Sequence, residues 1–261
     1  MQRIDVLLVV LALCSLWPPA AAKEADLAAS WYDLGDVRAL LIAPDKPAKT
    51  DRGKPWVWYA PAFDKRLPEQ RERWMIDRLL AKGIAVAAVD VGESFGSPRG
   101  RAVFTKLYEH MVEQGYSKKP VLLARSRGGL MHYNWAVENP DNVNGVAGIY
   151  PVCNLLSYPG LKKAAPAYDM TEAELKDHLT EHNPVDRLAP LAKARVPIFH
   201  IHGDNDRVVP LEDNSALLAT RYKKLGGPVT IEVIKEGGHD VKRHWFESQN
   251  LVDFMIDKSL Q

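Results

Sequence analysis

The sequence has no large excess of charge of either sign. Its 34 lysines and arginines balance 33 aspartates and glutamates, which leaves a formal charge of +1 over 261 residues. This balance provides no electrostatic attraction to nucleic acid or to an anionic membrane, so we expect neither as a partner. Internal repeats and low-complexity segments are also lacking. A chain of this length can bury a core of its own, which predicts one globular domain and leaves the oligomeric state open.

Cysteine is scarce, since the chain contains only Cys14 and Cys153. Cys14 lies in an N-terminal segment that we expect to be removed, and Leu13 before it disfavours lipid attachment there. Cys153 would then be the only thiol, so no internal disulfide can form. We expect Cys153 to be a small buried side chain.

Long apolar runs are confined to the N-terminus. One run covers residues 4–17 behind a basic start, and the small residues 20–22 follow it. The run is shorter than the roughly 20 residues of a transmembrane helix, and its order of features is typical of a secretory signal peptide. We therefore expect residues 1–22 to be cleaved, and the mature chain 23–261 to be secreted or periplasmic without membrane contact.

The rest of the chain alternates short apolar runs with longer segments of helical periodicity. Apolar runs flanked by helices predict a mostly parallel, doubly wound sheet of the α/β class. The first expected strand, residues 36–44, is assigned as antiparallel. The further expected strands are residues 56–60, 84–89, 120–124, 146–150, 197–202 and 229–235. The expected helices are residues 70–82, 102–114, 128–139 and 211–224.

Residues 154–195 interrupt this alternation. They contain a polar segment, Thr171 to His182, behind a potential capping box of Thr171 and Glu174. We expect a small helical insertion over the carboxyl edge of the sheet, where ligands bind in such folds.

Two serines compete for the role of nucleophile. Ser94 lies in residues 92–96, which spell G-x-S-x-G, whereas Ser126 lies in residues 124–128, which begin with alanine. A nucleophile elbow needs a strand, a sharp turn at the serine and an immediate helix, with small residues two positions before and after. Ser126 meets these demands, because Ala124 and Gly128 are small and a helix is expected to follow.

The segment after Ser94 is different. Residues 96–100 read Gly-Ser-Pro-Arg-Gly, a run that we expect not to start a helix. The sequence therefore predicts Ser126 as the nucleophile and a glycine-rich loop around Ser94.

An acid and a base follow in the order required for a catalytic triad. The expected strand at residues 197–202 runs into a loop with Asp204 and Asp206, and the next strand runs into a loop with His239. Serine, aspartate and histidine in this order, each after a strand, are typical of α/β-hydrolases.

From residue 38 to the C-terminus the chain resembles the dienelactone hydrolase and prolyl oligopeptidase-like branch of the α/β-hydrolases. That branch carries its acid in H-G-x-x-D-x-x-V-P, and residues 202–210 match it with Asp206 at the acid position. Gly-Gly-His at 237–239 is similar to the histidine loop, and residues 90–97 resemble the D-x-x-G-x-G-x-S loop. The departures are Ala124 and the lack of a His-Gly pair after residues 56–60, where Tyr59 stands instead.

The oxyanion hole requires two backbone donors. One is expected to be the N–H of Arg127, directly after the nucleophile, and the other comes from the loop after residues 56–60. Pro61 has no N–H, which leaves Ala62 or Phe63, and of these we favour Ala62.

Other chemical signals have simpler interpretations. His178 and His182 fit the zinc-protease pattern H-x-x-E-H, but their short polar segment predicts a solvated helix face. His200 and His202 share one face of a strand and are expected to lie in the core or to support site residues from behind, rather than to bind a metal. Arg125 and Arg127 next to Ser126 could meet an anionic substrate, although internal ion pairs are favoured. No metal and no cofactor are expected.

The predicted function is hydrolysis of a carboxylic ester, on a small molecule or a carbohydrate, by Ser126, His239 and Asp206 through an acyl-enzyme. A serine peptidase of the prolyl oligopeptidase type is the nearest alternative. A non-catalytic binding protein on a hydrolase scaffold is the alternative from another class.

Overall fold

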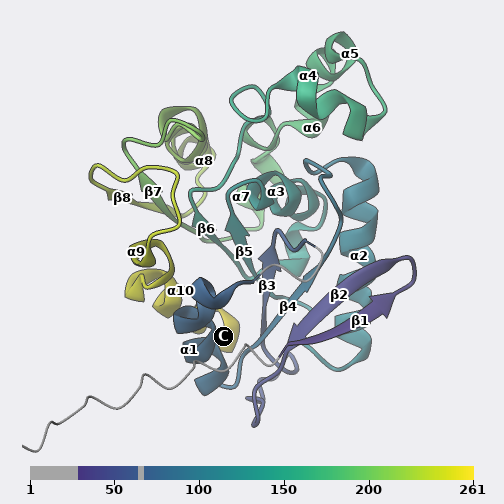
Figure 1. Cartoon of the computed structure of the whole chain (residues 1–261), viewed down its shortest axis with the longest axis vertical. Coiled ribbons are helices and arrows are strands. Elements are labelled where there is room, and N and C mark those ends of the chain that lie inside the picture. Colours follow the sequence, from purple (N-terminus) through teal and green to yellow (C-terminus); the bar gives the residue numbers. More distant parts are fainter. Residues whose placement is uncertain (1–28, 64–67) are drawn as a thin grey trace, which may run out of the picture.

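The computed structural model describes residues 29–63 and 68–261 (Figure 1). The expected signal peptide, residues 1–22, and Cys14 lie outside the described residues. Among the residues described, no helix is long and apolar enough to cross a membrane.

The described residues form an eight-stranded sheet in the order β1-β2-β4-β3-β5-β6-β7-β8. β1 pairs antiparallel with β2, and β2 antiparallel with β4, whereas all later pairs are parallel. The predicted antiparallel first strand and the parallel sheet are thus confirmed. The strands are Ser30–Leu34 (β1), Val37–Ile42 (β2), Trp56–Ala60 (β3), Ala85–Val89 (β4), Val121–Arg125 (β5), Gly145–Ile149 (β6), Ile198–Gly203 (β7) and Val229–Ile234 (β8).

Helices cover both faces of this sheet, as Figure 1 shows. Alternate residues of β3 enter two different cores: Trp56 and Trp58 pack on one side, and Val57 and Tyr59 on the other. α2, α3 and α8 contribute to the first core, and α1 and α10 to the second. The main helices are Arg73–Ala81 (α1), Pro98–Glu113 (α2), Gly128–Glu138 (α3), Leu217–Lys224 (α8) and Gln249–Leu260 (α10).

Short helical turns complete the connections between these elements. They are Gln70–Glu72 (η1), Pro140–Asn142 (η2), Ala165–Tyr168 (η3), Pro184–Asp186 (η4), Glu212–Ala216 (η5) and Arg243–Phe246 (α9).

The start of α2 corrects one prediction. The helix begins at Pro98, inside the run of residues 96–100 that was expected to exclude a helix, and the Ser97 side chain caps its N-terminus. Proline is favourable at the first helical position because its missing N–H has no intrahelical partner there. β1 and α10 were not expected either.

The helices of the insertion are Leu161–Ala164 (α4), Glu172–Asp177 (α5), Leu179–His182 (α6) and Ala189–Lys193 (α7). Most of the insertion lies above α3 at the top of Figure 1, where α4, α5 and α6 are labelled, whereas α7 lies beside α3. The capping box of Thr171 and Glu174 is present. The expectation of a fully solvated segment is wrong, because the helix breaks at His178, and Leu175 and His182 turn into the apolar interior of the insertion.

Candidate active site

Ser126 occupies a sharp turn between β5, which ends at Arg125, and α3, which begins at Gly128. Its φ angle is 48°, a left-handed conformation that costs energy for any residue with a side chain. The surrounding backbone holds the turn, since the N–H of Ser126 donates to the Ile149 carbonyl at 3.0 Å and the Gly129 N–H donates to the Ser126 carbonyl at 2.9 Å. The strand and the helix thus force the serine side chain outward.

The small residues around Ser126 have a steric role. A Cβ atom at Gly128 would lie 2.1 Å from the carbonyl oxygen of Ala60, which is closer than any real contact allows. Ala124, on the strand side, is fully buried and keeps its methyl group without such a clash. The elbow therefore requires glycine after the serine but accepts alanine before it.

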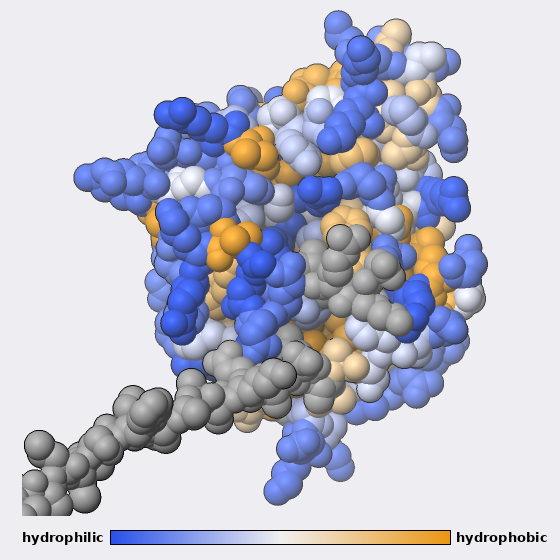
Figure 2. Space-filling view, viewed as in Figure 1, coloured by the Kyte–Doolittle hydropathy of each residue, from blue (hydrophilic) through white to orange (hydrophobic). Residues whose placement is uncertain are grey.

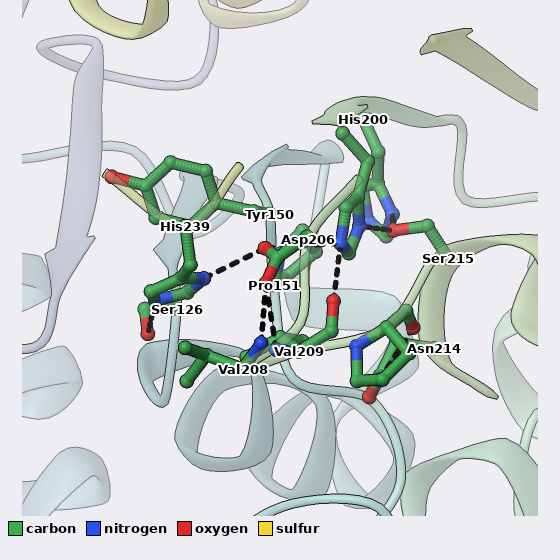
Figure 3. A network of polar contacts seen from close by, with 12 residues as sticks. Ser126, Tyr150, Pro151, His200, Asp206, Val208, Val209, Asn214, Ser215 and His239 are labelled. Carbon is green, nitrogen blue, oxygen red and sulfur yellow. Dashed lines mark hydrogen bonds and ion pairs between the residues drawn. The ribbon is translucent and has the colours of Figure 1, made fainter. Parts of the chain in front are cut away.

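Ser126, His239 and Asp206 form a continuous line of hydrogen bonds (Figure 3). Ser126 Oγ lies 2.9 Å from His239 Nε2, and His239 Nδ1 lies 2.8 Å from Asp206 Oδ2. Asp206 follows β7 and His239 follows β8, so two neighbouring strands present them at the same edge of the sheet. A Cβ atom at Gly203 would lie 2.0 Å from the Gly237 carbonyl oxygen, so the two loops meet at closest backbone approach.

The Asp206 carboxylate is held as an anion. Oδ1 accepts hydrogen bonds from the backbone N–H of Val208 at 2.9 Å and of Val209 at 2.8 Å. Burial alone would raise the pKa of Asp206, but contacts with His202, His239 and the Val209 amide outweigh it and lower the pKa well below its usual range. An ionised carboxylate can orient His239 and stabilise its protonated form.

A cleft of about 570 Å³ opens above Ser126 and His239. On the face shown in Figure 2 the surface is mainly hydrophilic, with hydrophobic residues in small separate patches. Val241 is 50% exposed and adds apolar surface to the cleft. The cleft is lined by Pro61, Phe63, Glu69, Glu93, Arg125, Ser126, Arg127, Tyr150, His239, Asp240 and Val241.

The second donor of the oxyanion hole was assigned to the loop after β3. Pro61 and Phe63 line the cleft, while Ala62 between them is buried and forms an isolated parallel bridge with Asp90. Arg127 lies at the N-terminus of α3, where backbone N–H groups lack intrahelical partners. Both predicted donors are therefore near the cleft, and their role stays a prediction.

Ser94 lies apart from this line of hydrogen bonds. Its side chain is 7% exposed, and its Oγ accepts a long hydrogen bond of 3.4 Å from the Gly96 N–H. Gly100 of α2 packs directly against it. Its neighbour Glu93 does reach the cleft, where it forms an ion pair with Arg127.

The arginines next to Ser126 form ion pairs, as favoured from the sequence. Arg125 Nη1 donates to Glu72 Oε1 at 2.6 Å, and Tyr59 donates to the same oxygen at 3.0 Å. Glu72 is fully buried, and burial raises its pKa although Arg125 and Tyr59 oppose this. The cluster of Tyr59, Glu72 and Arg125 therefore holds the guanidinium of Arg125, which lines the cleft, in a buried ion pair.

Sequence reasoning missed Glu72 and Tyr150. The Tyr150 ring lies 4.4 Å from the His239 ring, and its hydroxyl donates to the Asp240 carbonyl at 2.9 Å. It has a φ angle of 36° at the end of β6, which turns its side chain toward the cleft. Only the position of Tyr150 at a strand end could have drawn attention to it.

The histidine pairs considered as metal ligands serve other contacts. In the described part of the chain, no group of three or more histidine, cysteine, aspartate or glutamate side chains could hold a metal ion. His182 is buried against the Tyr168 ring, and His178 Nδ1 contacts the Glu174 carbonyl. His200 and His202 are fully buried, which confirms them as core histidines.

Comparison with known proteins agrees with this geometry. The sequence model of the prolyl oligopeptidase family matches residues 104–257, which include all three residues of the line Ser126–His239–Asp206. The match spans more than half of the chain, so the protein belongs to the prolyl oligopeptidase family. No curated protein sequence matches this chain.

Solved structures show the α/β-hydrolase fold at low sequence identity. A puromycin-hydrolysing peptidase of Mycobacterium tuberculosis is similar with a TM-score of 0.68 and 15% identity, over 89% of this chain and 39% of the peptidase. The present chain therefore spans well under half of that protein. An S-formylglutathione hydrolase of Agrobacterium tumefaciens is similar with a TM-score of 0.67 and 15% identity, over 89% of this chain and 95% of the hydrolase. Carboxyl esterase 2 of Tuber melanosporum has a TM-score of 0.63 and 17% identity, over 92% of this chain and 89% of the esterase.

Proposed function

We propose that this protein hydrolyses carboxylic esters through an acyl-enzyme on Ser126. The observation that carries the proposal is the unbroken hydrogen-bonded line from Ser126 through His239 to the ionised Asp206, at the floor of an open cleft. The elbow turn supports it, because a strained serine is retained where its side chain has a chemical role.

The reaction follows from these contacts. His239 Nε2 accepts the proton of Ser126 Oγ as this oxygen attacks the ester carbonyl carbon, and Asp206 stabilises the resulting imidazolium. His239 then gives the proton to the leaving alkoxide, so that the alcohol departs and the acyl group remains on Ser126. Water attacks the acyl-enzyme with His239 again as the base, which releases the acid and restores the serine hydroxyl.

The negative charge on the tetrahedral oxygen requires donors that are already in position. We assign them to the N–H of Arg127 and the N–H of Ala62, with Phe63 as the second candidate for the β3 loop. The isolated bridge between Ala62 and Asp90 holds this loop in place beside the cleft, which is the support for the assignment of Ala62. One such donor contributes roughly 3–4 kcal/mol to transition-state stabilisation.

The family alone does not decide between an ester and a peptide substrate, because it also contains peptidases. The proposal of an ester therefore rests on similar solved structures. Two proteins named as an S-formylglutathione hydrolase and a carboxyl esterase are similar over nearly their whole length. The substrate class that we propose is an acyl ester on a small molecule or a carbohydrate, and peptide hydrolysis is the alternative.

A substrate panel tests the choice. The purified protein would be assayed on p-nitrophenyl acetate, longer-chain p-nitrophenyl esters, acetylated sugars and peptide p-nitroanilides. We expect kcat/KM on at least one ester to exceed that on every peptide. Faster peptide cleavage would favour the peptidase, and no turnover together with no fluorophosphonate labelling would favour a binding protein.

The proposed mechanism uses no metal or cofactor. We expect EDTA treatment followed by dialysis to leave ester turnover unchanged. Loss of turnover on chelation, with recovery on addition of Zn²⁺, would contradict the assignment.

We also propose that the protein is secreted or periplasmic after cleavage behind Ala22. The support is the N-terminal sequence pattern alone. Mass spectrometry of protein from its natural host should find Lys23 as the first residue, and an intact Met1 or a lipid on Cys14 would contradict the proposal.

A further inference from the structure

Behind Asp206, on the side away from Ser126, lies a second line of polar contacts (Figure 3). His202 Nε2 lies 2.8 Å from the Val209 carbonyl oxygen and 3.6 Å from Asp206 Oδ2. His202 Nδ1 lies 2.8 Å from Ser215 Oγ. The same Ser215 oxygen lies 2.9 Å from His200 Nδ1.

The line continues to helix α3. His200 Nε2 lies 2.6 Å from the hydroxyl oxygen of Tyr133. All of these side chains are fully buried, so bulk water does not compete for their hydrogen bonds. We call this set the buried chain, and it consists of Tyr133, His200, Ser215 and His202.

The chemistry of the partners fixes the direction of every hydrogen bond in the buried chain. The Val209 carbonyl can only accept, so His202 carries its proton on Nε2 and its Nδ1 accepts from the Ser215 hydroxyl. Ser215 Oγ then accepts from Nδ1–H of His200. His200 Nε2 is left as an acceptor, and the Tyr133 hydroxyl donates to it. The two histidines therefore have opposite tautomers.

Both tautomers require neutral imidazole rings. Burial, with a smaller contribution from the neighbouring His202, lowers the pKa of His200 to about 3. A second proton on His202 or His200 would turn the ring nitrogen that accepts from Ser215 or Tyr133 into a donor, and the hydroxyl proton would lose its acceptor within the buried chain. The arrangement is therefore self-consistent only with both rings uncharged.

The backbone of Val209 connects the buried chain with the acid. Its N–H donates to Asp206 Oδ1 at 2.8 Å, and its carbonyl accepts from His202. Asn214 holds the next carbonyl, of Pro210, through a hydrogen bond of 2.9 Å. Hydrogen bonds from His202 and Asn214 to two successive carbonyl groups thus fix the loop that carries Asp206.

We propose that the buried chain is a positioning device for Asp206. It holds His202 in the Nε2–H tautomer, His202 holds the Val209 backbone, and this backbone keeps Asp206 Oδ2 directed at His239. The proposal rests on the proposed function, in which Asp206 orients His239. Tyr133, His200, Ser215 and His202 are positioning residues, since they act through Asp206.

Nuclear magnetic resonance of the intact protein tests the directions of the hydrogen bonds in the buried chain. In protein labelled with ¹⁵N-histidine, long-range proton–nitrogen correlation spectra identify the protonated nitrogen of each ring. His202→Gln and His200→Gln variants assign the two signals. We expect a neutral Nε2–H tautomer for His202 and a neutral Nδ1–H tautomer for His200 at pH 7. The same tautomer for both rings, or a charged ring, would overturn the proposal.

Ser215→Ala tests the consequence for turnover. Loss of the hydroxyl removes both links between the histidines and leaves His202 held by the Val209 carbonyl alone, so that the ring and the loop it supports can shift. We expect kcat to fall roughly 10- to 100-fold, as is usual for a small displacement of a catalytic group, with KM nearly unchanged. The midpoint of the pH–kcat profile should also move to lower pH, because a displaced carboxylate stabilises the imidazolium of His239 less.

The pH readout is specific because the surroundings of His239 stay constant in this variant. The other titratable groups around it are unchanged: Glu69, Glu93, Arg125, Arg127, Tyr150 and Asp240. Ser97→Ala is the matched control, since Ser97 is a buried serine whose hydroxyl caps α2. It should lower stability without moving the pH midpoint. A Ser215→Ala profile that matches this control would contradict the positioning role.

Two further variants keep the proposal open to contradiction if Ser215→Ala does not fold. Tyr133→Phe removes only the far donor, so we expect a smaller loss in kcat, about 2- to 10-fold, and the same direction of pH shift. Ser215→Thr retains the hydroxyl and should recover most of the turnover. If wild type shows neither turnover nor labelling of Ser126, the proposed function fails, whereas the tautomers still decide the hydrogen-bond directions independently.

Discussion

The loops after β4 and β5 both carry a serine and both contain a residue in the left-handed region, yet they present their serines in opposite ways. In the β5 loop the strained residue is the serine itself, with a φ angle of 48° at Ser126. In the β4 loop it is the following residue, Phe95, with a φ angle of 47°. In the β4 loop the left-handed position is thus occupied by Phe95, which is buried in the apolar core of the insertion, and Ser94 is not presented to the cleft.

The consequences of this shift extend to the surroundings. Ser126 Oγ contacts His239 at the floor of the cleft, whereas Ser94 is buried against Gly100. The G-x-S-x-G letters of residues 92–96 therefore do not identify the nucleophile. The pattern describes close backbone approaches around a turn, and alanine at 124 satisfies them as well as glycine would.

The largest expected effect separates the two serines. Ser126→Ala should lower kcat on an ester by about 10⁶-fold, because the oxygen that forms the acyl-enzyme is lost. Fluorophosphonate labelling of this variant should also be lost. Initial-rate kinetics on an ester measure the loss of turnover. Peptide mapping of the fluorophosphonate label in wild type identifies the labelled serine.

Ser94→Ala is the matched control. It removes a hydroxyl that makes one long hydrogen bond, so the loss should not exceed roughly 5- to 150-fold, corresponding to 1–3 kcal/mol. A fluorophosphonate label that maps to Ser94 would contradict the comparison between the two loops.

The second effect concerns Asp206, the acid that is connected with Ser126 through His239. Asp206→Asn should lower kcat by about 10⁴-fold, since an amide cannot stabilise the imidazolium and favours the wrong tautomer of His239. Asp204→Asn is the control two residues away, where the exposed carboxylate accepts a hydrogen bond from the Glu236 N–H and has no contact with His239 in the described residues. Equal losses in the two variants would contradict the assignment of Asp206.

Sequence reasoning predicted some residues of the site and missed others. Ser126, Asp206 and His239 could be assigned because each follows a parallel strand, and parallel strands bring their carboxyl ends to one edge. Glu72, Tyr150 and Ser215 could not be assigned, because their contacts join segments that are far apart in the chain and leave no local pattern. The start of α2 at Pro98 could have been predicted, since serine followed by proline is a helix N-terminal signal.

The third prediction concerns the close approach in the elbow. Gly128→Ala places a Cβ atom 2.1 Å from the Ala60 carbonyl oxygen, so either the elbow or the β3 loop must move. We expect at least a 100-fold loss in kcat/KM, because a displacement of about 1 Å is sufficient for that. Gly92→Ala, in the β4 loop, places its Cβ atom where nothing lies within 4 Å. Its φ angle of 61° should cost stability, but kcat/KM should change less than 10-fold. Similar losses in both variants would show that the two loops are not sterically different.

The fourth prediction uses the lowered pKa of Asp206. A carboxylate with a lower pKa in the folded state stabilises the fold above its unfolded pKa of about 3.9, and this stability is lost as pH falls through the folded pKa. The free energy of unfolding of wild type should therefore fall more steeply below about pH 4 than that of Asp206→Asn. The difference should be on the order of 2 kcal/mol, measured by urea unfolding at several pH values. If the free energy of unfolding depends on pH in the same way in both proteins, the lowered pKa of Asp206 is not the source of this stability.

The smallest expected effect comes from completing the motif at the true nucleophile. Ala124→Gly converts residues 124–128 into G-x-S-x-G, but the elbow already accommodates the Ala124 methyl group. We expect kcat/KM to stay within about 3-fold of wild type, because neither Ser126 nor its partners need to move. Stability should fall by about 1–2 kcal/mol, since a buried methyl group is lost and glycine is unfavourable inside a strand. Ester kinetics and urea unfolding of the variant give the two values. A large gain in turnover would mean that the first glycine of the motif has a chemical role beyond its size, and that the two loops differ less than their geometry indicates.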